Sequence, residues 1–387
     1  MPTRDLRLDS LRGIFLVLMT IDHLGGKLTA YTYEPFGFVS AAAAFVMLSA
    51  YMYAYTTRGT APSLAALGAQ SLKRAARLYR YHLGLFLLVV LLTLLSPVHA
   101  DYLDRHIYPA DMSLRAALLY GTALVHQPPF MDLLPMYLFL SLLSPVLLMA
   151  FHRRWYGLVF TLSLAFWLCG QFFDPLEWLA EFSGSGARAG AFNVLSWQLL
   201  WVAGLYIGFN HGVEKRNVFF RQPLCLWIAI VTATGFFLAR HGVIPFASSL
   251  EFYLEKADLR ILRLANIFSQ VVIFCHLVKF VRADTGLAWF RFIGRYSLQV
   301  FCFHVLLVNF LMPLSWRIGM LFGYAGEVLY FLAAAASLTL PALLYRAYET
   351  QLRAGGKRTW PDKLAAMRRV GRNMLTLRRL SNSRSAR

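Results

Sequence analysis

The stretch "LRGIFLVLMTIDHL", residues 11–24, combines an apolar run with charged groups near both of its ends. Its middle is apolar enough to enter a lipid bilayer. Arg12 lies at its start, and the adjacent pair Asp22 and His23 lies near its end. An ionisable side chain at membrane depth costs roughly 3 kcal/mol, so such residues are retained mainly for function. The run therefore predicts a membrane helix that carries chemistry.

Composition places the whole chain in the membrane class. Of its 387 residues, 58% are hydrophobic and only 15% are charged, against about 25% charged residues in a soluble domain. The mean hydropathy is positive, at +0.53. The four cysteines lie in apolar runs at unrelated spacings, which favours buried free thiols over disulfides or a zinc site. We find no phosphate-binding loop, no GxSxG elbow and no metal-binding histidine motif, so no metal is expected.

Windows of about 20 apolar residues predict ten membrane-spanning helices in one all-α bundle. They cover residues 11–30, 36–56, 83–100, 130–151, 155–173, 191–209, 223–240, 261–281, 296–314 and 326–346. The apolar stretch 113–126 is short and is expected to lie on the surface or to re-enter. We expect an integral membrane domain over residues 1–347 and a basic tail over residues 348–387, which either lies on anionic lipid or is disordered.

The distribution of the formal net charge of +19 indicates a topology, and it argues against nucleic acid as a partner. One set of alternating connections, with the two ends of the chain, Arg12 and Arg346, holds 29 of the 38 Lys and Arg residues but only 6 of the 19 acidic residues. Positive charge prefers the cytoplasmic side. The sequence therefore predicts cytoplasmic N and C termini in a bacterial inner membrane, with membrane lipids as neighbours; a homo-oligomer is left open.

The first predicted helix places Arg12 and His23 on one face. Eleven residues span three helical turns plus roughly 20°, and separate the two side chains by about 16 Å along the axis. In the predicted topology Arg12 lies near the inner surface, and His23 lies in the outer half. Asp22 points about 100° away from His23 and can bind a neighbouring helix, or orient His23 if the helix end unwinds. The alternative is a structural polar pair.

A basic segment follows the second predicted span. Lys73, Arg74, Arg77 and Arg80 recur at helical spacing, which predicts a basic stripe on the cytoplasmic side. Arginine binds phosphate oxygens through two parallel hydrogen bonds, so the stripe is a candidate site for a phosphorylated donor. Binding of lipid headgroups explains the same pattern equally well.

Two further histidines lie in apolar windows. His304 is in "GRYSLQVFCFH", near the middle of the ninth span, and His276 is in the eighth. A lone histidine in an apolar helix is commonly a packing residue, so both readings stay open for these two. The acids of the predicted outer loops, such as Asp174 and Glu251, are interpreted as solvated.

Taken together, these segments resemble membrane acyltransferases of the acyltransferase-3 type. "RLDSLRGIFLVLMTIDH" (7–23) resembles their first helix, "RAARLYR" (74–80) their Arg-x-x-Arg-x-Tyr segment, and "FVMLSAYMYAY" (45–55) their "LSG" helix. "GRYSLQVFCFH" (294–304) is similar to their late histidine-bearing helix. The blocks "FGFVSAAAAFVMLSAY", "MDLLPMYLFLSLLSPVLL" and "AFNVLSWQLLWVAGLYIG" are similar to the branch that succinylates osmoregulated periplasmic glucans.

The resemblance implies an O-acyltransferase that moves an acyl group, most simply succinyl, from cytoplasmic acyl-CoA to hydroxyls of a periplasmic glucan. The arginines of the basic stripe, with Lys73, would hold the CoA phosphates, and Arg12 would guide the acyl arm. His23, with Asp22, would act as general base. Ser49 or His304 would stabilise the oxyanion or align the acceptor. Acyl-CoA is then a substrate, and no permanently bound cofactor is expected.

Two departures from the family pattern leave other readings open. The glycine usual after the serine of "LSG" is Ala50, which is expected to open the local packing slightly, and an expected acid is replaced by Ala43. A different surface glycan as acceptor, a catalytically silent relative, and a proton-coupled transporter or flippase therefore remain alternatives.

Overall fold

The computed structural model describes residues 5–57, 63–95, 112–211, 222–245, 248–278, 280 and 287–354. Within these ranges every regular element is a helix, so the prediction of an all-α fold is confirmed. Most of the predicted tail, residues 355–387, lies outside the described part of the chain. The helices are α1 (Leu6–Leu24), α2 (Thr29–Thr32), α3 (Ala41–Thr56), α4 (Leu64–Leu95), α6 (Leu114–Thr122), α7 (Leu133–His152), α8 (Tyr156–Cys169), α9 (Pro175–Phe182), α10 (Val194–Phe209), α11 (Pro223–Arg240), the 3-10 helix η3 (Ser248–Leu254), α12 (Ile261–Leu277), α13 (Ala288–Arg295), α14 (Ser297–Ser337) and α15 (Thr339–Ala354).

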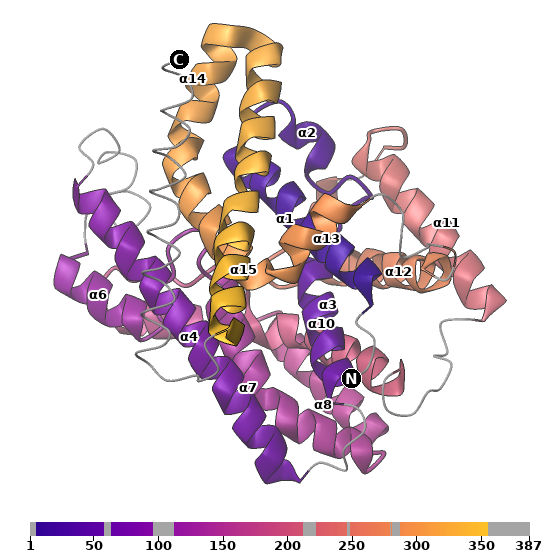
Figure 1. Ribbon diagram of the computed structural model, residues 1–387. Helices are drawn as coiled ribbons and strands as arrows, with labels where there is room; N and C mark the ends of the chain where they lie inside the picture. Colours follow the sequence, from indigo (N-terminus) through magenta and orange to yellow (C-terminus); the bar gives the residue numbers. More distant parts are fainter. Residues whose placement is uncertain are drawn as a thin grey trace.

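Helix α1 lies inside the bundle, where it packs against α3, α13 and α14 (Figure 1). Its backbone touches that of α13 because both helices carry a glycine at the crossing. A Cβ atom on Gly13 would collide with the backbone of Phe290, and one on Gly294 would collide with the carbonyl oxygen of Asp9. Small residues at such crossings are typical of membrane helices, because they let backbones approach closely. Two glycines therefore fix the position of the helix that carries Arg12 and His23.

A second close crossing joins α3 to α10. A Cβ atom on Gly204 would meet the carbonyl oxygen of Met47 and the side chain of Ala50, and one on Gly208 would meet the backbone of Tyr51. Helix α10 also contacts α7 and α8, so its side chains are buried almost all round. This explains why its sequence is apolar without a polar face.

Helix α4 joins the basic segment and the third apolar window in one continuous helix of 32 residues. At 1.5 Å per residue it is about 48 Å long, which exceeds the hydrocarbon thickness of about 30 Å. It packs against α7. The described part of the predicted span at 83–100 is therefore the end of a longer helix that begins with the basic segment, and residues 96–100 lie outside the described residues.

The C-terminal part of the described chain forms a helical hairpin. The chain bends by 91° between α13 and α14. Gly323, at φ 61° and ψ −158°, breaks α14 into two arms, and Figure 1 shows the second arm and α15 running back alongside the first. The tenth predicted window, 326–346, crosses the boundary between α14 and α15 at Leu338.

Each of the ten predicted windows overlaps a helix in its described part, but the bounds differ and ten membrane spans stay a prediction. Within the described residues, four helical segments are long and apolar enough to cross a membrane: Leu64–Leu95, Leu133–His152, Pro223–Arg240 and Arg317–Gln351. A fifth is added if the bent pair of α13 and the start of α14 is one span. Four further apolar helices, α3, α8, α10 and α12, have only 14 to 17 residues. Helix α6, in the short stretch 113–126, has nine residues.

Candidate functional site: a histidine pair and an arginine pair at the two ends of one helix

The last turn of α1 and the first arm of α14 bring two predicted site histidines together. Nδ1 of His23 lies 3.0 Å from Nε2 of His304, and the ring centroids are 5.2 Å apart. The two residues are 281 positions apart in the sequence. His304 is fully buried. Sequence analysis assigned a separate candidate role to each histidine, whereas the fold makes them hydrogen-bonding partners.

The hydrogen bonds of the pair determine which nitrogen carries a proton. Nδ1 of His304 lies 3.2 Å from the carbonyl oxygen of Phe301, which can only accept a hydrogen bond. In the neutral pair His304 therefore carries its proton on Nδ1, and its Nε2 accepts a hydrogen bond from Nδ1–H of His23. Nε2 of His23 is then the unprotonated nitrogen, and it makes no hydrogen bond within the described part of the chain. A free basic nitrogen on an oriented ring is what a general base requires.

The ring of His23 is also held from its face. Phe130 stacks on it with a centroid distance of 4.2 Å and an interplanar angle of 29°. Phe130 has a φ of 68°, a left-handed conformation that is a genuine outlier for a bulky residue. Such backbone strain persists only where the surrounding structure enforces it, commonly at functional sites.

Asp22 does not contact the imidazole of its neighbour. Its Oδ1 accepts a hydrogen bond of 2.6 Å from the hydroxyl of Thr32 in α2. Helix α1 stays regular to Leu24, so the two adjacent side chains diverge as helical geometry requires. Of the two roles considered for Asp22, the structure has the one in which it binds a neighbouring helix, and the orientation of His23 comes from His304.

Charged groups that the sequence analysis did not single out surround this end of α1. Glu34 forms a buried ion pair of 2.5 Å with Arg263, and Asp132 accepts a hydrogen bond of 2.9 Å from the backbone N–H of Ala191. Lys256 is half-buried, with its ammonium 5.7 Å from the ring centre of Tyr33. Arg263 lies inside the eighth apolar window. Its position there is the sequence signal that could have identified it, because ionisable residues at membrane depth are commonly functional.

Lys256 lies in the loop between η3 and α12, and burial lowers the pKa of its ammonium because the group loses the water that stabilises its charged form. The charge on Lys256 interacts with the carboxylates of Glu34, Asp132 and Asp22. With Arg263, which also acts on Lys256, these interactions place two cations among three acids beside the histidine pair.

At the other end of α1, Arg12 and Arg74 approach each other. The guanidinium of Arg74 lies over the rings of Tyr53 and Trp201, at 4.9 and 5.7 Å from their centres. It is close enough to Arg12 for the two positive charges to repel. Arg12 also lies 3.9 Å from the carboxylate of Asp9, one turn earlier in α1. Two cations in one interior site favour an anionic ligand between them.

Two hydroxyl groups accompany this arginine pair. Tyr137 of α7 lies beside Ser49, and its hydroxyl interacts electrostatically with both Arg74 and Arg12. Ser49 therefore belongs to the arginine end of the bundle. Of the two residues proposed to stabilise the oxyanion or align the acceptor, His304 alone contacts His23.

The fold divides the predicted basic stripe. Arg74 points toward the rings of α3 and α10, whereas Lys73, Arg77 and Arg80 are exposed. Nε of Arg80 donates to the carbonyl oxygen of Ala76 on its own helix, at 3.2 Å. The three exposed cations are available to a ligand or to lipid headgroups at the surface, and Arg74 is available to a ligand inside the bundle.

Both departures from the family pattern are buried in α3. Ala50 is fully buried and faces Gly204, whose lack of a side chain accommodates its methyl group. Ala43 lies in the first turn, where its backbone N–H donates to Oγ of Ser40 at 3.3 Å. Since Ala43 is 1% exposed, an acid at this position would be buried as well.

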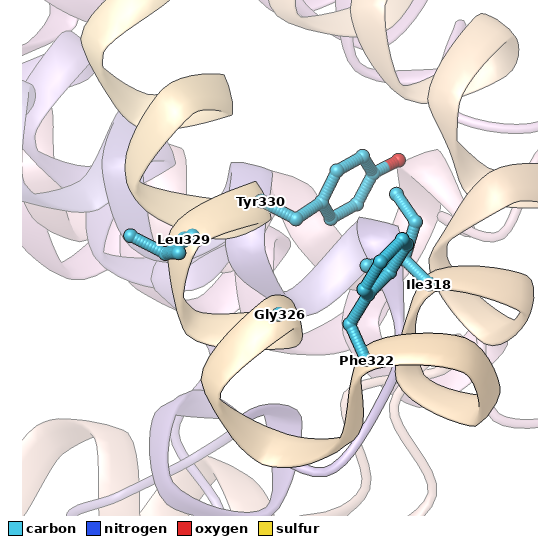
Figure 2. Close-up of a pocket in the computed structure, with 5 residues that line it drawn as sticks. All are labelled: Ile318, Phe322, Gly326, Leu329 and Tyr330. Carbon is cyan, nitrogen blue, oxygen red and sulfur yellow. The ribbon is translucent and has the colours of Figure 1, made fainter.

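An apolar pocket lies in the C-terminal hairpin, and its lining residue Tyr330 packs on the same apolar cluster as Leu24 and Phe130 at the histidine end of α1. It has a volume of about 560 Å³, and it is lined by Ile318, Phe322, Gly326, Leu329 and Tyr330. Figure 2 shows Ile318 and Phe322 beside the ring of Tyr330. The hydroxyl of Tyr330 donates to the carbonyl oxygen of Leu311 at 2.5 Å. None of the five lining residues is an acid or a histidine, so the pocket offers no catalytic group.

Metal-binding groups and cysteine thiols were the other candidate sites. In the described ranges of the chain, no group of three or more His, Cys, Asp and Glu residues is placed to hold a metal ion. The four cysteines are free thiols.

Comparison with known proteins identifies one family. The family model described as OpgC protein matches residues 4–350, which is most of the chain. Neither the curated proteins nor the solved structures gave a match. The matched range includes α1, the basic half of α4 and the histidine-bearing arm of α14.

Proposed function

The chain belongs to the OpgC family, a membership that points to a membrane acyltransferase acting on osmoregulated periplasmic glucans, and we propose that it transfers a succinyl group from cytoplasmic succinyl-CoA to glucan hydroxyls. The observation that carries this proposal is the hydrogen-bonded pair of His23 and His304, which leaves Nε2 of His23 free. A hydroxyl is a weak nucleophile at neutral pH, so acyl transfer to a sugar needs such a base.

The proposed donor site lies at the arginine end of α1. The exposed cations Lys73, Arg77 and Arg80 hold the nucleotide phosphates of acyl-CoA through charge-assisted hydrogen bonds. Arg74 and Arg12 guide the acyl-carrying arm into the bundle. Support comes from the juxtaposition of these two guanidinium groups, whose mutual repulsion an anionic donor relieves.

The proposed reaction takes place at the histidine end. Nε2 of His23 removes the proton from a sugar hydroxyl as its oxygen attacks the thioester carbonyl. The new C–O bond forms, the C–S bond breaks, and the proton passes from the imidazolium to the departing CoA thiolate. His304 stabilises the imidazolium, because its Nε2 accepts the hydrogen bond from Nδ1–H of His23.

We also propose the membrane arrangement that this chemistry needs. All ten helical windows span an inner membrane in an acyltransferase-3-like bundle with both termini cytoplasmic, so the arginine end faces the cytoplasm and the histidine end the periplasm. Positive charge in the predicted inner connections supports this orientation. The distance of about 16 Å between Arg12 and His23 lets one bound donor extend from the inner side to the base.

The test is the mass of periplasmic glucans from cells that lack the chain and are supplied again with wild type or His23→Ala. One succinyl increment per modified site is expected with wild type, and none with a stably produced His23→Ala variant. Purified protein should also transfer the acyl group without an ion gradient, which a transporter would not do. Unmodified glucans in the wild-type cells would overturn the proposal.

A further inference from the structure

Three loop segments converge at the histidine end of α1, and each contains a residue with a strained backbone. Glu34, Phe130 and Leu259 have φ values of 56°, 68° and 52°, although none of them is glycine. They lie between α2 and α3, between α6 and α7, and between η3 and α12. Left-handed backbone at non-glycine residues costs about 1 to 3 kcal/mol each and clusters at binding sites. The strained backbone therefore indicates that a functional constraint holds these three loops in place.

Lys256 is a cation of this region whose ammonium has no hydrogen-bond or ion-pair partner among the described residues, whereas the neighbouring Arg240 donates to the carbonyl oxygen of Tyr33. The side chain is half-buried, and Nζ lies 5.7 and 6.0 Å from the ring centres of Tyr33 and Phe192. In the described part of the chain Nζ makes no hydrogen bond and no ion pair. Its charge nevertheless acts on His23 and on Asp22. A half-buried ammonium has three donors that need acceptors, and a ligand bound beside His23 would supply them.

A second polar group nearby also lacks partners. Asn266 of α12 is fully buried, and neither its amide nitrogen nor its amide oxygen forms a hydrogen bond with the described residues. It lies against Gly37, in the segment that also carries Glu34. Buried polar atoms without partners are rare in native proteins and mark places where water or a ligand completes the structure.

The charges of the cluster select among possible ligands. Glu34 and Arg263 neutralise each other in their ion pair. The remaining cations, Lys256 and Arg240, are matched by two carboxylates, Asp22 and Asp132, so the site has no excess of positive charge for an anionic ligand. Carboxylates accept hydrogen bonds from hydroxyl groups, an ammonium donates to hydroxyl oxygens, and aromatic rings cover the apolar faces of a ligand. This combination fits a neutral polyhydroxylated ligand better than the carboxylate of a succinyl group.

We infer that Lys256 binds the acceptor sugar, together with Asp22 and Asp132, and holds its reacting hydroxyl at Nε2 of His23. This inference rests on the proposed function, because it names the acceptor subsite of that reaction. Lys256 donates to a hydroxyl oxygen neighbouring the one that reacts, and Tyr33 and Phe192 lie along the sugar ring.

The test measures acceptor and donor dependence separately, with full-length purified protein, succinyl-CoA and unmodified periplasmic glucan. Lys256→Met should raise KM for the glucan by roughly 10- to 100-fold, the range for losing a hydrogen bond from a charged donor. KM for succinyl-CoA should stay within about twofold. Lys256→Arg should restore part of the acceptor affinity, which a merely structural role would not require. Lys256→Gln is the second variant if Lys256→Met does not fold.

Lys27 is the matched control, since it is an exposed lysine in the turn that follows α1. Lys27→Met should leave both KM values unchanged. An unchanged glucan KM in Lys256→Met and Lys256→Gln would overturn the inference. A change confined to the KM for succinyl-CoA would also overturn it, because Lys256 would then bind the acyl group of the donor. Both results leave the proposed function standing, whereas a wild-type protein that modifies no glucan overturns the two together.

Discussion

The bond between the two histidines offers the most direct test of the proposed mechanism, through a pair of variants at His304. His304→Met removes the hydrogen-bond acceptor that faces Nδ1 of His23, and His304→Gln replaces it with an amide oxygen on a side chain of similar length. His304 is fully buried, so similar volume matters. The difference between the two variants therefore reports the hydrogen bond and not the packing.

The magnitude follows from the charge that His23 gains in the transition state. When Nε2 takes the sugar proton, the 3.0 Å bond from Nδ1 to His304 becomes a hydrogen bond from an imidazolium. Hydrogen bonds to charged groups contribute about 1.5 to 3 kcal/mol. At 1.36 kcal/mol per factor of ten, His304→Met should lower kcat by roughly 10- to 150-fold. His304→Gln should recover most of this loss, with KM for either substrate little changed in both variants.

The assay is steady-state succinyl transfer by purified protein in detergent or liposomes. His276→Met is the control, because His276 is another histidine of an apolar helix, α12, and its Nδ1 has no partner among the described residues. In a His23→Ala background, the difference between His304→Met and His304→Gln should disappear, because residues that act as a unit are not additive. Equal kcat for His304→Met and wild type would refute the mechanism. So would an unchanged difference in the His23→Ala background.

Three further variants test the donor end, the helix crossing and the acid at the start of α7. Arg74→Gln should raise KM for succinyl-CoA by roughly 10- to 100-fold in transfer kinetics, since Arg74 points into the bundle. Arg80 is exposed, so Arg80→Gln should change this KM less than fivefold, and equal changes in the two variants would contradict the division of the basic stripe. Gly13→Ala should lower the midpoint of thermal unfolding, because its methyl group meets the backbone of α13 and overpacking costs about 1 to 3 kcal/mol. Gly68 has open space around it, so Gly68→Ala should raise this midpoint slightly. Asp132→Asn should raise KM for the glucan, because asparagine removes the negative charge that acts on Lys256, while its amide oxygen still accepts a hydrogen bond from the Ala191 N–H. An unchanged glucan KM in this variant would contradict the placement of Asp132 in the acceptor subsite.

The sequence by itself determined the all-α fold class, and it singled out the helix that we propose carries the chemistry. Low charge content, apolar windows and the distribution of Lys and Arg are local properties, so they can be read without knowing any contact. The spacing of Arg12 and His23 fixed their common face, because helical geometry is set by the backbone alone. The same reasoning predicted that Asp22 diverges from His23, as the structure shows.

Only the tertiary structure decided which residues complete the site. His304 becomes the partner of His23 because glycines at residues 13 and 294 bring α1 and α13 into backbone contact, and the bend after α13 directs α14 along α1. Helical periodicity places Arg74 about 100° from Lys73, but only the rings that receive it show that this direction is inward. Lys256 lies in a loop and Asp132 at the start of α7, and packing, not periodicity, brings these two side chains together. Residues distant in sequence meet through the close packing of whole helices, and that packing depends on all of the contacts at once.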